Sequence, residues 1–399
     1  MSNELQTFVS VGDILIQCES DTKDLFDGVR GEISGADIAL GQLESVYTDR
    51  GQPTYVDPFV TQVAGMPPHQ IKDIRDAGFD VLTLCGNHAW DLGREGVEDT
   101  IAACDKYGLI HTGAGMNLEE ARRPAIVDVH GVKYGFLGYN CTGPAGSWAQ
   151  EDKPGCNYIH SVTAFEYPVP NIGGIPARYS YPVEDDLERM QRAVNDLREQ
   201  VDILSVSIHK GVGFIPAAIS LHEHIIARAA IDAGADVVFG HHGHLLKGVE
   251  TYKGKAIFHD LGNFMAAGDL NGEKYFRYGS KKEHRVQNKS YTYEQKIQRE
   301  KEFNLRNGGP FVWGPLGTTV SWPVPETIYT MIAKCYVRNK VIEKVTYVPC
   351  IFDDDGYVTI LTAAQEEAQN LFTYISNITA HAHMDTKYEW DGDEIRIVF

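Results

Sequence analysis

Residues 225–244 read I-I-A-R-A-A-I-D-A-G-A-D-V-V-F-G-H-H-G-H, and this stretch decides the fold. Its first half has the pattern of an amphipathic helix, Gly234 suits the left-handed cap that follows a helix, and the apolar run before Gly240 predicts a short strand covered on both faces. Residues 71–88, I-K-D-I-R-D-A-G-F-D-V-L-T-L-C-G-N-H, repeat the unit. In both copies, polar residues able to bind a metal follow the strand directly.

Helix and strand alternate along much of the chain. A helix over 187–200 precedes a strand over 202–209, and residues 7–16 and 36–40 also have the composition of buried strands. Such alternation is typical of a layered α/β fold, in which functional groups gather on loops at the carboxyl ends of strands. A turn at Asp391-Gly392 predicts a hairpin near the end of the chain.

The composition argues against nucleic acid and membranes as partners. The 399 residues are 43% hydrophobic, which is enough for a substantial core. The chain has 36 Lys and Arg against 55 Asp and Glu, and the resulting net charge of -19 repels phosphate backbones and anionic lipids. The start of the sequence lacks a secretory pattern, and no apolar stretch reaches the roughly 18 residues of a membrane span, so we expect a cytoplasmic protein. Seven cysteines without C-x-x-C spacing predict reduced, mostly buried thiols.

Two long segments interrupt the alternation. Residues 141–182 are rich in Gly, Pro and Tyr, and residues 266–325 are charged in their middle. Loops of this length are usually functional, so both are candidate walls of a substrate site. We therefore expect a catalytic core over 1–265 with 141–182 as an inserted loop, a lid or substrate loop over 266–325, and a C-terminal completion of the same domain over 326–399.

Residues of the types that bind metals follow five separate predicted strands. They are Asp13, Glu44, Asn87 with His88, His209, and His242 with His244. Imidazoles and carboxylates are natural ligands of Zn, Mn and Fe, and His242 and His244 project to the same side of an extended loop. A single histidine is more often a hydrogen-bonded core or surface group than a ligand. Five strand ends together favour a metal site.

These motifs resemble, in order, those of calcineurin-like metallophosphoesterases and, more closely, those of the CapA family of poly-γ-glutamate capsule biosynthesis proteins, which share that fold. The stretches that carry the resemblance are Asp13 in G-D-I-L, Leu43-Glu44, G-N-H-A-W-D-L-G at 86–93, S-I-H-K-G around His209, G-H-H-G-H at 240–244 and L-G-N-F at 261–264. The resemblance covers residues 7–265 and, more weakly, 328–348.

The resemblance implies an α/β fold with four layers, α-β-β-α, and a metal centre at the sheet edge. The ligands it implies for one or two divalent ions, Mn, Zn or Fe, are Asp13, Glu44 as the bridging carboxylate, Asn87, His209, His242 and His244. His88 would stand near the leaving group as a general acid or transition-state donor. Asp91 either hydrogen-bonds an imidazole and fixes its tautomer or caps a helix.

The chain departs from the pattern of these families in three motifs, one of which has Gln42 in place of the asparagine of N-L-E. Leu15 replaces the histidine of the D-x-H motif, a loss that CapA-like chains share. The motif H-W-G-x-E reads H-K-G-V-G here, which puts Lys210 in place of a tryptophan and Gly213 in place of a glutamate. An ammonium beside a metal favours an anionic substrate, unless Lys210 merely points to water, so Lys210 is a candidate for catalysis and substrate binding. The other candidate substrate-binding residues are Arg123, Tyr139 and Asn140.

Hydrolysis is the reaction class that such a metal site serves best. The first hypothesis is a hydrolase in which a metal-bound hydroxide attacks an amide, lactam or lactone carbonyl of a small carboxylate-bearing substrate. The alternatives are a phosphomonoesterase or phosphodiesterase and a non-catalytic component that assembles or binds a poly-γ-glutamate capsule. The chain is a possible homo-oligomer. We expect His222 and His224, on either side of Glu223 in a predicted helix, to face solvent.

Overall fold

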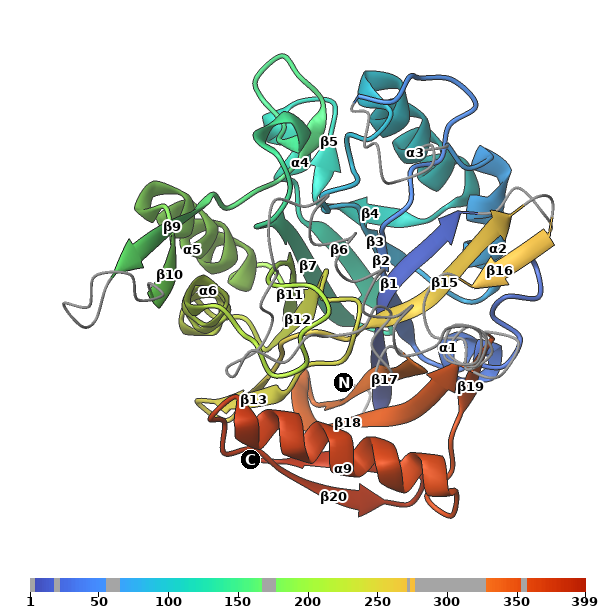
Figure 1. The fold of residues 1–399 in the computed structure, drawn as a ribbon, viewed down its shortest axis with the longest axis vertical. Helices are drawn as coiled ribbons and strands as arrows, with labels where there is room; N and C mark the ends of the chain where they lie inside the picture. Colours follow the sequence, from blue (N-terminus) through green and yellow to red (C-terminus); the bar gives the residue numbers. More distant parts are fainter. Residues whose placement is uncertain are drawn as a thin grey trace, which may run out of the picture.

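Two β-sheets pack face to face, and helices cover their outer faces (Figure 1). The computed structural model describes residues 4–17, 22–54, 65–166, 177–270, 273–276, 328–352 and 357–399. The four-layer α-β-β-α arrangement expected from the sequence is confirmed.

The first sheet is mixed and combines strands from both ends of the chain. Its strands, in spatial order, are β20 (Lys387–Asp391), β21 (Glu394–Val398), β18 (Val341–Phe352), β17 (Tyr329–Arg338), β1 (Gln6–Gln17), β2 (Ile38–Leu43), β3 (Val81–Thr83) and β4 (Ile110–Thr112). Three further strands pair at its side, β15 (Asn263–Leu270) with β1, β16 (Glu273–Phe276) with β15, and β19 (Val358–Ile360) with β18. The predicted hairpin at Asp391-Gly392 joins β20 to β21.

The second sheet is parallel at its centre. Its order is β13 (Val249–Tyr252), β14 (Lys255–Phe258), β12 (Val237–His241), β11 (Ile203–His209), β7 (Val132–Asn140) and β6 (Ala125–Val129), with β13 and β6 antiparallel at the edges. Two small ribbons lie outside the sheets, β5 (Ala114–Gly115) with β8 (Gly155–Cys156), and β9 (Ser161–Glu166) with β10 (Ala177–Pro182).

Apolar clusters hold the layers together. Between the sheets, Phe8 packs edge to face against Tyr134, Phe136 and Phe239, with ring centroids between 5.6 and 6.0 Å apart. A second cluster joins the first sheet to α1 (Arg30–Ser34), α2 (Ile71–Asp76) and α3 (Gly93–Tyr107). A third joins the second sheet to α5 (Glu184–Arg198) and α6 (Leu221–Asp232). Within the described residues, the remaining helices are η1 (Pro68–Gln70), α4 (Leu118–Ala121), η2 (Ala145–Ser147) and α9 (Glu366–His381), of which α9 packs on β18 and β13.

The repeated helix-to-strand connectors have the expected backbone. Gly78 and Gly234 follow α2 and α6 with φ angles of 111° and 119°, a region that glycine enters at no steric cost. Each chain reversal leads into the next strand of its sheet, and the polar loops after β3 and β12 meet, with Asn87 Oδ1 3.1 Å from His242 Nδ1.

β1 departs from the prediction that Asp13 follows the end of a strand. The strand continues to Gln17, and Asp13 lies at an irregularity where the neighbour of β1 changes from the antiparallel β17 to the parallel β15. A Cβ atom on Gly12 would lie 1.9 Å from the carbonyl oxygen of Gly262, so only glycine permits this crossing.

The predicted inserted segments are partly described. Residues 141–166 and 177–182 form η2, β8 and the β9–β10 ribbon, and 263–270 form β15, whereas most of the expected lid over 266–325 lies outside the described residues. β17 and β18, from the region after 326, extend the sheet of β1. Among the described residues, no helix combines the length and apolar character needed to cross a membrane.

Candidate metal centre

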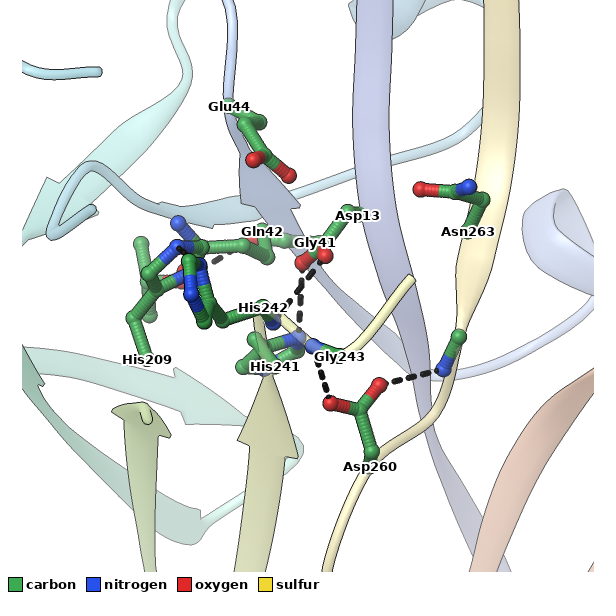
Figure 2. A network of polar contacts seen from close by, with 12 residues as sticks. Asp13, Gly41, Gln42, Glu44, His209, His241, His242, Gly243, Asp260 and Asn263 are labelled. Carbon is green, nitrogen blue, oxygen red and sulfur yellow. Dashed lines mark hydrogen bonds and ion pairs between the residues drawn. The ribbon is translucent and has the colours of Figure 1, made fainter. Parts of the chain in front are cut away.

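The six metal-ligand candidates come together from both sheets, in two groups. Figure 2 shows four of them, Asp13, Glu44, His209 and His242. The first group is Asp13, Glu44 and His244, which offer one ligand atom each within 4.8 Å of one another. His244 Nε2 lies 3.6 Å from Glu44 Oε1, and His244 Nδ1 lies 3.8 Å from Asp13 Oδ2. β1, β2 and the loop after β12 therefore deliver this group to one point.

The second group is Asn87, His209 and His242. Asn87 Oδ1 lies 2.7 Å from His209 Nε2 and 3.1 Å from His242 Nδ1, and the two imidazole nitrogens are 3.2 Å apart. These atoms come from the ends of β3, β11 and β12. An amide oxygen and two imidazoles at these spacings suit a second divalent ion.

The carboxylates of the first group have oxygen atoms without donors. Both oxygens of Glu44 are buried and accept no hydrogen bond among the described residues, and the one polar contact of the buried Asp13 Oδ1 given for these residues is His241 Nδ1 at 3.3 Å. Leaving buried carboxylate oxygens unpaired is costly, and a cation that they coordinate removes that cost. The described residues of this site therefore fit a divalent ion.

Burial shifts the pKa values of the carboxyl and imidazole groups in the site. Burial, followed by the neighbouring charge of Asp13, raises the pKa of Glu44 well above its usual range, so this carboxyl group has to release a proton when it binds an ion. For Asp13, burial acts in the same direction, but its contact with His241 and the charges of His241, His209 and His244 outweigh it and lower the pKa. Burial lowers the pKa of His209 and brings that of His242 to about 3, so both imidazoles are neutral and can bind a metal.

His88 and Asp91 form a pair at the edge of the centre. His88 Nδ1 donates to Asp91 Oδ2 over 2.6 Å, and His88 Nε2 lies 3.8 Å from Glu44 Oε1. The side chain of His88 is 27% exposed, whereas that of Glu44 is fully buried. α3 begins at Gly93 after Leu92, so of the two alternatives for Asp91 the structure has the hydrogen bond to an imidazole.

Two further residues belong to the site that the sequence analysis did not assign. His241 is 1% exposed, with Nδ1 3.3 Å from Asp13 Oδ1. Asn263 Oδ1 lies 2.9 Å from His244 Nδ1, so that the ring donates to Asn263 and turns Nε2 towards Glu44. The L-G-N-F motif was the available signal for Asn263, but a motif match alone gives no direction for a side chain.

Lys210 does not face the centre. Its side chain is fully buried, and Nζ lies 3.2 Å from each of three acceptors, Glu223 Oε2, His259 Nδ1 and the carbonyl oxygen of His259. An ammonium group with three protein acceptors has no hydrogen left for a substrate. This placement argues against the predicted catalytic and substrate-binding roles of Lys210 and against the alternative that it points to water.

The other predicted substrate-binding residues, Tyr139, Asn140 and Arg123, contact neighbouring parts of the fold. Tyr139 is 4% exposed within the apolar cluster below α5 and α6. Asn140 is fully buried and bonds Thr142, Ser147 and Cys156, so it fixes the segment after β7. Arg123 follows α4, and its carbonyl accepts the hydroxyl of Thr112. The described contacts of these three residues join them to the fold rather than to the centre.

Another cluster of possible metal ligands, formed by His224, Glu250 and His259, lies near Lys210, and its members hydrogen-bond one another or neighbouring side chains. Glu250 Oε2 is 3.1 Å from His224 Nδ1 and 3.0 Å from His259 Nε2, and Arg228 Nε donates to Oε1 over 2.6 Å. Since Lys210 donates to His259 Nδ1, Nε2 carries the proton of that ring and donates it to Glu250. Because two cations, Lys210 and Arg228, already contact this group and would repel a metal ion, we interpret it as a hydrogen-bonded network.

The histidines of α6 were expected in solvent, and for His222 this is wrong. His222 is 8% exposed and bonded to Ser180, and Glu223 is fully buried. Glu223 Oε1 accepts the backbone N–H of Ser220 over 2.6 Å as half of a helix capping box, while Oε2 accepts from Lys210.

Residues 7–267 match the family model described as bacterial capsule synthesis protein PGA_cap. The chain belongs to this family. It is 28% identical to the capsule biosynthesis protein CapA of Bacillus anthracis over 270 residues, which are 66% of this chain and 60% of that protein. It is 31% identical to the PGA biosynthesis protein CapA of Bacillus subtilis over 196 residues, 49% of this chain and 44% of that one. The predicted resemblance to the CapA family is thereby confirmed.

The match to these PGA_cap relatives is partial. The chain spans about 60% of the length of the Bacillus anthracis protein. Among solved structures, it is similar to a phosphatase from Mycoplasma pneumoniae with a TM-score of 0.45 and 13% identity, over 87% of this chain and 94% of the other.

Proposed function

We propose that this PGA_cap protein is a metal-dependent hydrolase that acts on the carbonyl of an amide, lactam or lactone in a small carboxylate-bearing substrate. The observation that carries the proposal is the set of buried carboxylate oxygens without donors on Asp13 and Glu44, beside neutral imidazoles. Asp13, Glu44 and His244 would hold one divalent ion, and Asn87, His209 and His242 a second.

When bound, such an ion lowers the pKa of water and polarises the scissile bond. The protein residues add orientation: Asn263 fixes the tautomer of His244, and the contact between Asn87 Oδ1 and the rings of His209 and His242 keeps three ligand atoms together. Mn, Zn and Fe all match this mixture of nitrogen and oxygen ligands.

His88 supports the hydrolytic part of the proposal. Its bond to Asp91 orients the ring so that Nε2 points towards the centre, 3.8 Å from Glu44 Oε1. From there the ring can donate a proton to the departing amine or alkoxide. Its partial exposure lets it recover a proton from solvent.

The substrate class is supported by the names of relatives. Two are described as capsule or PGA biosynthesis proteins, and a third, 30% identical over 251 residues, as a probable polyglutamine synthesis accessory protein of Mycobacterium tuberculosis. Glutamyl polymers contain amide bonds flanked by carboxylates, so a glutamyl amide is the first substrate to test. Because Lys210 is buried, the group that binds the substrate carboxylate is another residue.

The test is a hydrolysis assay of γ-glutamyl amides, lactams and lactones with Mn²⁺, Zn²⁺ or Fe²⁺, run on the wild-type protein and on His244→Ala. Turnover of a carbonyl substrate that requires both the metal and His244 is the expected result. Stoichiometric metal binding without turnover of any compound would instead favour a component that binds or assembles the polymer.

The two ligand groups favour one alternative reaction. A pair of metal positions suits in-line displacement at phosphorus, because one ion can stabilise the attacking oxygen and the other the leaving oxygen. A chromogenic phosphomonoester and phosphodiester therefore belong in the same assay. If their metal-dependent kcat/KM exceeds that of every carbonyl substrate and is lost in His244→Ala, the protein is a phosphoesterase.

A further inference from the structure

Asp260 lies behind the metal centre and bonds two backbone segments that carry its ligands. Its carboxylate is buried, at 1% exposure, in the loop between β14 and β15. Asp260 Oδ2 accepts the N–H of Gly243 over 2.5 Å, and Oδ1 accepts the N–H of Gly262 over 2.8 Å (Figure 2). One carboxylate thus hydrogen-bonds both the loop after β12 and the segment that contacts β1.

The loop after β12 needs such support. His242 and His244 have φ angles of 90° and 56°, a left-handed region that costs about 1–3 kcal/mol per residue and persists only where the surroundings enforce it. Three hydrogen bonds enforce it here. Asp13 Oδ2 accepts from His242 N, Asp260 Oδ2 accepts from Gly243 N, and the carbonyl oxygen of Gly243 accepts from Phe214 N.

The second bond of Asp260 reaches the other side of the centre. Gly262 receives it, and the carbonyl oxygen of Gly262 accepts the N–H of Asp13 over 2.9 Å. Asp260 is therefore connected to three ligands through one intervening residue in each case. Gly243 links it to His242 and His244, and Gly262 links it to Asp13.

Gly243 shows how closely the carboxylate is fitted. A Cβ atom at this position would lie 2.5 Å from Asp260 Oδ2, so a side chain and the carboxylate cannot both occupy the space. The glycine between the two histidines thus makes room for the acid.

We propose that Asp260 is a positioning residue of the metal centre, which sets the spacing between Asp13 and the His242–His244 loop and thereby the affinity for metal. The proposal rests on the metal centre of the proposed function. An asparagine at this position keeps one acceptor oxygen but turns an NH₂ group towards a backbone N–H, so it breaks one of the two bonds. Residues that orient metal ligands change affinity by about 10- to 100-fold when they are lost.

The experiment compares three folded, chelator-treated proteins by calorimetric titration with Mn²⁺ and Zn²⁺: wild type, Asp260→Asn and Asp236→Asn. Asp236 is the matched control, because its carboxylate accepts the backbone N–H of Leu204 over 2.8 Å at the opposite end of β11 and β12. Gly243→Ala, which pushes a methyl group against the carboxylate, is the second variant if Asp260→Asn does not fold. The absorption spectrum of the Co²⁺-loaded proteins reports ligand geometry independently of activity.

We expect Asp260→Asn, or Gly243→Ala, to raise the metal Kd about 10- to 100-fold and to shift the Co²⁺ spectrum, with Asp236→Asn unchanged. Wild-type affinity and spectrum in the Asp260 and Gly243 variants would overturn the inference, and so would an equal loss in Asp236→Asn. A wild-type protein that binds no metal would overturn the proposed function and this inference with it.

Discussion

Two buried polar clusters, the metal centre and the cluster around Lys210, differ in how their oxygen atoms are used. In the metal centre, Asp13 and Glu44 present oxygens without donors. In the cluster around Lys210, both oxygens of Glu223 and both of Glu250 accept from protein groups. The residue types are similar, since both contain histidines and glutamates within a few ångströms.

The difference teaches that donor count, rather than residue type, separates a metal site from a structural network. A buried carboxylate that is matched by N–H donors is complete, whereas one without donors needs a cation or a proton. Substitutions on the two sides should therefore have different consequences, loss of metal on one and loss of folding stability on the other.

The largest effect is expected from His244→Ala in the metal centre. It removes the imidazole of the group formed with Asp13 and Glu44, and with it several kcal/mol of transition-state stabilisation, or about a 10³-fold loss of kcat/KM. Steady-state kinetics with saturating metal measures it. Turnover within a factor of about two of wild type would show that this group is not the catalytic centre.

Lys210→Met should act on stability instead. It leaves the fully buried Glu223 without its closest cation, and breaking such a pair costs about 3–5 kcal/mol. Urea denaturation of the metal-free protein measures the change, and metal content should remain at the wild-type level.

The double variant Lys210→Met/Glu223→Gln sharpens this test. It removes both charges and should lose less stability than Lys210→Met alone. Burial raises the pKa of Glu223, but the charges of Lys247 and Lys210 outweigh it and lower the pKa. The ion pair therefore adds to the free energy of unfolding above the unfolded pKa of about 4.3, and this contribution disappears as the pH falls below that value. A double variant less stable than the single one would contradict the account of this network.

Asp91→Asn should slow the reaction without releasing metal. The bond from His88 Nδ1 weakens, the ring is held less firmly towards the centre, and general-acid catalysis falls by about 10²-fold. The pH profile of kcat should change with it, which a purely structural role of Asp91 would not produce. An unchanged profile with an unchanged kcat would remove His88 and Asp91 from the mechanism.

The smallest effect is expected for His224→Ala. Its ring, 21% exposed, supplies one of three donors to Glu250, so the loss should be about 1 kcal/mol in the free energy of unfolding. Metal content should not change. A loss of one metal equivalent would show that the group of His224, Glu250 and His259 binds an ion after all.

The sequence was informative where side chains follow strands. Glu44, Asn87, His209, His242 and His244 converge because parallel strands end at a common edge, a rule that needs no knowledge of contacts. Asp13 joins them from an irregularity inside β1, which this rule does not predict. The two glycine connectors could also be predicted, because a backbone with positive φ favours glycine at that position.

The directions and roles of the residues around the centre could not be predicted as well from the sequence. Lys210 directly follows a ligand, but its direction depends on Glu223 and His259, which lie 13 and 49 residues away. Tyr139 and Asn140 end a strand of the second sheet as well, yet they pack into its outer face and the following segment. Asp260 could not be recognised, because its partners are backbone N–H groups that any residue possesses.

Metal content tests the central claim most directly. Elemental analysis of protein purified without chelator or histidine tag should find about two equivalents of Mn, Fe or Zn per chain, since the centre offers two groups of ligands. A folded His242→Ala/His244→Ala variant, which loses one imidazole from each group, should retain almost none. Equal metal content in the two proteins, or none in the wild type, would contradict the account.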